Sequence, residues 1–204
     1  MSAPFVIGFD LDMTLIDSRP GMAAVIREIN AETGYQIDAD SVAGHLGPPL
    51  DQLLAPWVPA DDRDALVVRF RELYPRLAIT PAAALAGARE ALEEVYSRGG
   101  RAIVITGKYT PNARLHLKHL DLRYDSLTGA SWADAKTAAL QEAGAAAYVG
   151  DHPADMLSAK AAEALAVGVP TGGASRADLV TAGADVVLDS LVEFPGWLDG
   201  FLTR

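Results

Sequence analysis

A short apolar run that ends in two acids constrains this chain more than any other feature. The run is Phe5–Phe9, and it lies between Pro4 and Asp10. Its composition is typical of a strand that is buried on both faces in a parallel sheet. Asp10 and Asp12 come directly after it. Because a buried carboxylate is costly unless it is paired or bound to a metal, these acids are poorly explained as core residues.

The two acids also lie where ligands usually bind. In open α/β sheets, ligands bind at the carboxyl ends of the strands. A single Asp in this position is explained more simply as a turn residue or a helix N-cap. Here Thr14 and Asp17 follow Asp10 and Asp12 within one short stretch. The combination favours a functional site over a cap.

Strands and helices alternate along most of the chain, which predicts an α/β fold with a parallel sheet and helices on both faces. The expected strands after the first are 101–105, 126–128, 145–149, 164–167 and 186–188. The expected helices are 18–33, 50–57, 87–98, 110–120, 133–143 and 153 to about 163. A further helix is expected to begin at its cap, Asp61 or Asp62, and to end at about 77. Thr110 is the expected cap of 110–120.

The stretch 18–82 is expected to contain helices and no strand, with an irregular segment at 35–49. It lies between the first core strand and the next α/β unit, so we interpret it as an inserted helical cap. The core is then 1–17 together with 83–204, a Rossmann-like three-layer unit. A loop is expected at 81–85, where the chain returns from the cap to the core.

Composition excludes some classes of partner. The net charge is -10 and the pI is about 4.7, which argues against nucleic acid or an anionic membrane as the main partner. The chain has no Cys, so thiol chemistry is excluded. No basic region precedes the first apolar run, and no stretch approaches the length of a membrane span. We therefore expect a soluble cytoplasmic protein, and the sequence leaves open whether it is a monomer or a homodimer.

Two further strand ends carry polar groups that can meet Asp10 and Asp12. Thr106 and Gly107 follow the strand 101–105, and Asp151 and Asp155 follow the strand 145–149. Thr106 alone is adequately explained as a cap, and the two acids alone as a cap and a first-turn acid. In a parallel sheet, however, these ends share one edge, so the residues can converge.

The stretch Asp10–Asp17, Asp-Leu-Asp-Met-Thr-Leu-Ile-Asp, resembles the first motif of the haloacid dehalogenase superfamily, with Met13 where Gly is usual. Thr106-Gly107 resembles the second motif and Gly150-Asp151…Asp155 the fourth. The third motif is a Lys or Arg, for which Lys136 is the preferred candidate and Lys108 and Lys118 are rivals. Lys108 also matches a Lys that often follows the second motif in phosphoglycolate-phosphatase-like members.

The resemblance implies a Mg²⁺-dependent phosphatase that hydrolyses a small phosphomonoester, similar to phosphoglycolate phosphatases. Asp10 would be the nucleophile that forms an aspartyl-phosphate, and Asp12 the general acid and base. The implied phosphate-binding residues are Thr14, Thr106, Gly107 and Lys136. The implied magnesium ligands are Asp10, the carbonyl of Asp12, Asp151 and Asp155.

Two alternatives remain open on the sequence, and a third is argued against. One is a phosphomutase with the same core, and another is a binding protein that holds a phosphorylated ligand without turnover. A receiver domain also has a phosphorylatable acidic strand end, but it has no helical insertion at this point. The four His residues form no metal-ligand pattern. We expect His116 and His119 at the surface, His45 in the cap, and His152 near the substrate at most.

Overall fold

The structure is a computed structural model that describes residues 4–203. Its centre is a six-stranded sheet in which every neighbouring pair is parallel, in the order β5-β4-β1-β6-β7-β8. The strands are β1 (Val6–Phe9), β4 (Arg101–Ile105), β5 (Ser126–Thr128), β6 (Ala147–Gly150), β7 (Leu165–Gly168) and β8 (Val186–Val187). The α/β class predicted from the alternation is confirmed.

The first strand lies inside this sheet, as its apolar composition predicts. All four residues of β1 are buried, and Phe9 stands opposite Val104 of β4 on one side and Val149 of β6 on the other. The three strands that carry the predicted site therefore lie side by side in the middle of the sheet.

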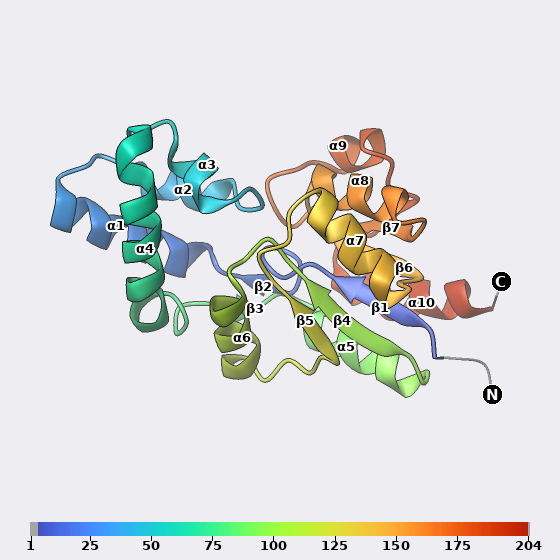
Figure 1. The fold of residues 1–204 in the computed structure, drawn as a ribbon. Coiled ribbons are helices and arrows are strands. Elements are labelled where there is room, and N and C mark those ends of the chain that lie inside the picture. The colour runs from blue at the N-terminus through green and yellow to red at the C-terminus, as the bar shows by residue number, and fades with distance from the viewer. Residues whose placement is uncertain (1–3, 204) are drawn as a thin grey trace.

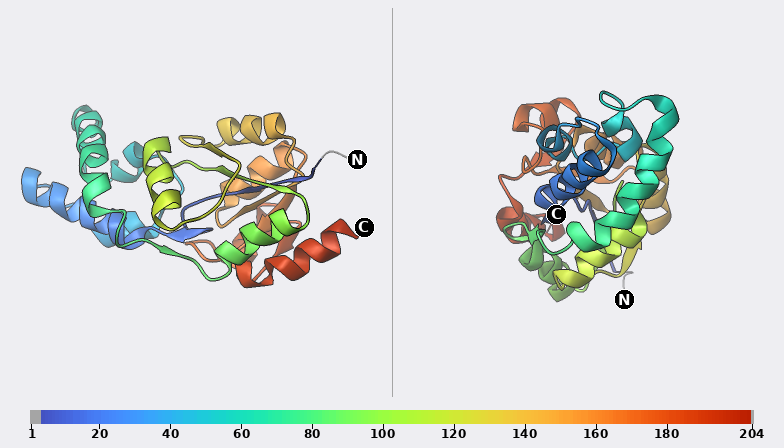
Figure 2. Two further views of the ribbon diagram at one scale, coloured as in Figure 1. Left: turned by 90° about the horizontal axis from the view of Figure 1, so that it is seen from below. Right: turned by 90° about the vertical axis from the view of Figure 1, so that its left-hand side faces the viewer.

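Helices cover both faces of the sheet and complete a three-layer core (Figures 1 and 2). One face packs against α5 (Ala88–Ser97), α6 (Thr110–His119) and α10 (Phe194–Leu202). The other packs against α7 (Asp134–Ala143), α8 (Pro153–Ala161) and α9 (Arg176–Thr181). A short 3₁₀ turn, η1 (Leu191–Glu193), precedes α10.

The remaining helices pack around an apolar cluster of their own. They are α1 (Arg19–Thr33), α2 (Ala39–Gly44), α3 (Leu50–Leu54) and α4 (Ala60–Leu77). Ile26, Ile29, Phe70 and Leu73 are among the buried residues of this cluster. Figure 1 shows these helices projecting beyond the end of the sheet at which β1 stops. The chain leaves and re-enters the sheet unit through the antiparallel pair β2 (Ile16–Asp17) and β3 (Ala83–Ala84).

The structure corrects several local expectations. The segment 35–49 contains α2, whose N-cap Asp38 accepts hydrogen bonds from the backbone N–H groups of Asp40 and Ser41. The loop expected at 81–85 contains β3, because the returning chain pairs with β2. Helix α4 begins at Ala60, so Asp61 and Asp62 lie in its first turn and do not cap it.

Other differences concern helix ends and the last quarter of the chain. Thr110 is the first residue of α6 and Tyr109 is its N-cap. Helix α3 ends at Leu54, before the predicted 57. Helices α9 and α10 were not predicted at all; α10 is anchored by Phe194 and Leu198, which are buried one turn apart. No helix within residues 4–203 is long and apolar enough to cross a membrane.

Candidate active site

The ends of three adjacent strands bring the predicted residues to one place. Asp10 follows β1, Thr106 follows β4, and Asp151 follows β6. All three side chains are buried. Backbone bonds fix the strand ends: the N–H of Asp10 donates to the carbonyl of Val149, and that of Thr106 to the carbonyl of Thr128. The convergence expected from a parallel sheet is therefore observed.

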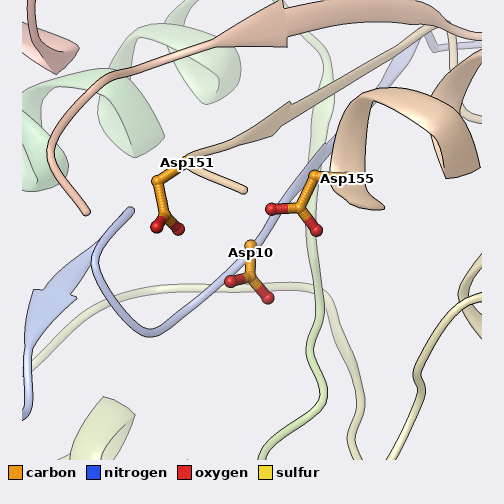
Figure 3. A group of neighbouring side chains, drawn as sticks. All are labelled: Asp10, Asp151 and Asp155. Atoms are coloured by element: carbon orange, nitrogen blue, oxygen red, sulfur yellow. The ribbon is translucent and has the colours of Figure 1, made fainter. Parts of the chain in front are cut away.

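Three acids form the centre of the site. Asp10, Asp151 and Asp155 each present a carboxylate oxygen within 4.8 Å of the others. Figure 3 shows the side chains converging from the end of β1, the end of β6 and the first turn of α8. Burial, together with the nearby Asp155 and Asp12 carboxylates, raises the pKa of Asp10 to about 7 against the opposing charge of Lys136. Burial and the same kind of repulsion raise the pKa of Asp151 well above its ordinary value.

These three acids fit a hard divalent cation. Mg²⁺ is bound in proteins through carboxylate and carbonyl oxygens, waters and substrate phosphate. The donors here are all oxygens, and within residues 4–203 Lys136 is the one cation paired with Asp10, so the negative charge of the three acids is compensated by protein groups only in part. A bound cation would supply the remaining compensation.

Lys136 is the lysine beside the first acid. Its Nζ lies 2.5 Å from Oδ1 of Asp155 and 3.3 Å from Oδ1 of Asp10. It is buried in the first turns of α7, where the left-handed Ala133 precedes the helix. The rivals lie elsewhere: Lys118 is exposed on α6, and Lys108 pairs with a different carboxylate.

Lys108 holds Asp12. Its Nζ lies 2.8 and 3.0 Å from the two carboxylate oxygens of Asp12, which also accepts a hydrogen bond from the Ser18 hydroxyl. Burial alone would raise the pKa of Asp12, but the Lys108 charge and the bonds from Lys108 and Ser18 outweigh burial and lower it. Asp10 and Asp12 are two residues apart, yet their environments move their pKa values in opposite directions. Such a divergence is typical of paired acids with separate roles.

Comparisons with known proteins agree with this geometry. The sequence profile of the haloacid dehalogenase-like hydrolases matches residues 7–169. This chain belongs to that family. It is 31% identical to a phosphoglycolate phosphatase of Rhodospirillum rubrum over 96% of this chain and 91% of that protein. Its structure resembles a haloacid dehalogenase-like hydrolase family protein from Streptococcus pneumoniae, with a TM-score of 0.84, 26% identity and coverage of 96% and 98% of the two chains.

A third relative has another activity in its name. The chain is 27% identical to the tyrosine-protein kinase PtkA of Mycobacterium tuberculosis over 132 residues, which are 63% of this chain. The match spans only 45% of the length of that kinase. The similarity therefore concerns part of the kinase.

Within the family motifs, the two Thr residues occupy different positions. Thr106 and Gly107 line a cavity that Asp10 and Lys136 also line. Thr14 is fully buried, is not among the cavity-lining residues, and donates its hydroxyl hydrogen bond to Oδ1 of Asp151 at 3.0 Å. Thr14 thus contacts one of the three clustered acids, whereas the resemblance implies that it contacts the substrate.

The cavity lies between the haloacid dehalogenase-like core and helices α1–α4, and has a volume of about 200 Å³. Its floor includes Asp10, Asp12, Thr106 and Lys136. Several lining residues were not predicted from the sequence, because they come from segments without a family motif: Met22, Leu46, Leu50, Leu53, Val67, Phe70, Arg71, Tyr74 and Trp132. For the apolar residues of helix α4 among them, the sequence signal is the apolar periodicity of that helix.

The His residues also differ from expectation in part. His116 is fully buried, against the surface position predicted, and its Nε2 lies 2.9 Å from the Tyr74 hydroxyl. The reason is that α4 packs against α6 and covers this side chain. Burial lowers the pKa of His116 to about 4. His119 is exposed as predicted, and His152 lines the cavity, where its ring packs against Trp132.

Gly150 and Gly172 leave the space that the carboxylates of Asp155 and Asp151 occupy. A Cβ at Gly150 would lie 2.4 Å from Oδ2 of Asp155, and a Cβ at Gly172 would lie 1.9 Å from Oδ2 of Asp151. Side-chain atoms cannot approach so closely, so any other residue would displace the carboxylate. Gly172 lies in the loop after β7, and the sequence reasoning missed it because no motif marks that loop.

Proposed function

We propose that this chain is a Mg²⁺-dependent phosphatase that hydrolyses a small phosphomonoester through an aspartyl-phosphate on Asp10. The observation that carries the proposal is the cluster of Asp10, Asp151 and Asp155 with Lys136 at the edge of the sheet. The phosphoglycolate phosphatase activity named for the R. rubrum relative supports the substrate class.

Asp10 is the proposed nucleophile. It lies on the floor of the cavity, and attack by its carboxylate on phosphorus would form the acyl phosphate and release the alcohol. Lys136, which now compensates the charge of Asp10 and Asp155, would also hold phosphate oxygens, together with the Thr106 hydroxyl and the Gly107 backbone. A cation held by Asp10, the carbonyl of Asp12, Asp151 and Asp155 would supply charge stabilisation to the transferring group.

Asp12 is the proposed general acid and base. It would donate a proton to the leaving alkoxide and then accept one from the water that hydrolyses the aspartyl-phosphate. Lys108 and Ser18 orient its carboxylate. Its lowered pKa suits the base role directly, whereas the acid role requires that substrate binding weaken the Lys108 contact.

Residues 18–82 are the proposed cap, and 1–17 with 83–204 the proposed catalytic core. The support is that the inserted helices have their own apolar cluster and that they line the cavity opposite the acids. A cap of this kind would exclude water during phosphoryl transfer and would contact the leaving group.

A phosphate-release screen tests the proposal. The chain and its Asp10→Asn variant are incubated with small phosphomonoesters, with Mg²⁺ and with chelator. We expect release only by the unmodified chain and only with Mg²⁺. Release by Asp10→Asn at a similar rate would refute the role of Asp10. Conversion of a sugar phosphate to its isomer without phosphate release would indicate a phosphomutase, and binding without turnover a binding protein.

A further inference from the structure

One positively charged side chain, that of Arg71, lines the cap side of the cavity. Most of the cap residues that line it are apolar, and the charged ones are Asp51 and Arg71. Arg71 lies on α4 and is exposed. The other lining cations, Lys108 and Lys136, come from the core and already bind carboxylates.

Arg71 differs from the other Arg residues of residues 18–82 in having no partner oxygen among the described residues 4–203. Arg63 donates to a backbone carbonyl, and each of the others lies within 4 Å of a carboxylate: Arg19, Arg27, Arg69 and Arg76. Within residues 4–203, no carboxylate lies within salt-bridge distance of Arg71, Asp51 included. Its charge therefore remains available in a chain of net charge -10.

A core residue holds this guanidinium in place. The Cζ of Arg71 lies 4.5 Å from the centroid of the Tyr109 ring, and Tyr109 also lines the cavity. A cation–π contact of this kind is attractive and leaves the N–H groups at the edge of the guanidinium free to donate. Arg71 is thus an oriented donor at the cap wall, across the same cavity from the phosphate-binding groups.

We propose that Arg71 binds a carboxylate on the leaving group of the substrate and so selects phosphomonoesters whose alcohol is itself an anion. The inference rests on the proposed phosphatase function. A planar guanidinium pairs with a carboxylate through two parallel hydrogen bonds. A cavity of about 200 Å³ is smaller than the sites of drug-sized ligands, so a compact substrate fits it.

The test compares two phosphomonoesters that differ in this one group. 2-Phosphoglycolate carries the carboxylate, and 2-hydroxyethyl phosphate has a neutral hydroxymethyl group in its place. Calorimetry with Mg²⁺ measures both dissociation constants on the Asp10→Asn chain, which does not turn over, with and without Arg71→Met. We expect Arg71→Met to lower the preference for 2-phosphoglycolate by roughly 10- to 100-fold. Arg76→Met on the same helix is the control and should preserve the preference.

An unchanged preference in the Arg71→Met variant would overturn the inference, as would an equal loss of affinity for both ligands. Arg71→Lys retains the charge without the planar pair of donors, so we expect an intermediate preference. Failure of the phosphatase proposal is seen separately, as absence of phosphate release by the chain with Asp10 intact. The binding comparison still decides the role of Arg71 in that case.

Discussion

Asp12 is the residue whose chemistry depends most on its neighbours. Its carboxylate is held by Lys108 and Ser18, and its pKa lies below the ordinary value while that of Asp10 lies above it. The two acids are two residues apart in sequence, and burial acts on both. The difference is made by the lysine that each one contacts and by the acids that surround Asp10.

The Asp12→Asn variant tests the acid role. An alkyl phosphate needs a proton on its leaving group, so we expect its phosphorylation step to slow by roughly 10²–10⁴-fold. The nitrophenolate leaving group of a nitrophenyl phosphate needs no proton, so the phosphorylation step with this ester should slow much less. Single-turnover kinetics on both esters measure the step. Asp17→Asn, an acid of the same stretch that pairs with Arg19, is the control. Equal fractional losses on the two esters would show that Asp12 is not the acid.

Met13 occupies a backbone conformation that favours Gly. Its φ is 59°, in the left-handed region, and its side chain is 3% exposed within the apolar cluster of the cap helices. The conformation costs roughly 1–2 kcal/mol. Burial of a Met side chain contributes roughly 1.5–3 kcal/mol, and truncation adds the cost of a cavity. Packing therefore outweighs strain.

We accordingly expect Met13→Gly to lower the free energy of unfolding by about 1–3 kcal/mol, although it restores the residue usual in the motif. Urea denaturation measures the change. Met13→Leu keeps the volume and the strain and should cost less than about 1.5 kcal/mol. A Met13→Gly variant more stable than the unmodified chain would mean that strain is the larger effect.

At the level of secondary structure, the ends of β1, β4 and β6 could be predicted from the sequence, because a short apolar run followed by polar residues is a local signal. The location of Lys136 beside Asp10 also agrees with the prediction from motif order. The contacts of Lys108 with Asp12 and of Tyr74 with His116 could not be predicted, since no sequence motif links the residues of either pair, which are 96 and 42 positions apart. The contact of Tyr74 with His116 depends on how α4 packs against α6.

The loop after β7 is a part of the site that only the structure identifies. A Cβ at Gly172 would lie 1.9 Å from Oδ2 of Asp151, so Gly172→Ala should displace that carboxylate. We expect a roughly 10–100-fold loss of Mg²⁺ affinity, as for other groups that orient a metal ligand. Gly173→Ala is the matched control, because its nearest neighbour is the Gly44 carbonyl at 3.2 Å. Equal Mg²⁺ affinity in the two variants, measured by calorimetry, would refute this role.

For the whole molecule, the buried acids link stability to pH. Asp10 has a pKa of about 7 in the folded chain against an ordinary 3.8, so the folded state holds this proton more tightly than the unfolded state. The contribution of Asp10 to the free energy of unfolding is fully present below about pH 4. It is lost as pH rises towards 7, by up to about 1.4 kcal/mol per pH unit. Asp151 acts in the same direction.

We therefore expect the metal-free chain to lose stability relative to Asp10→Asn as pH rises from 4 to 7. Mg²⁺ should stabilise the unmodified chain more at pH 8 than at pH 5, because it binds the deprotonated acids. Thermal unfolding with chelator and with Mg²⁺ measures both effects. The comparison with Asp10→Asn removes the opposite contribution of His116, whose lowered pKa makes stability rise between about pH 4 and 6.5. A difference between the two proteins that is independent of pH would contradict the account.

The central claim is that Asp10 carries the phosphoryl group during turnover. The most direct measurement is acid quenching of the Asp12→Asn variant during reaction with a nitrophenyl phosphate and Mg²⁺, followed by mass spectrometry of its peptides. Formation of the intermediate needs no acid with this ester, but its hydrolysis still needs the base. The account predicts one phosphoryl group on the peptide that contains Asp10, and none in the Asp10→Asn/Asp12→Asn variant. Nitrophenol release with no phosphoryl group on Asp10 would contradict it.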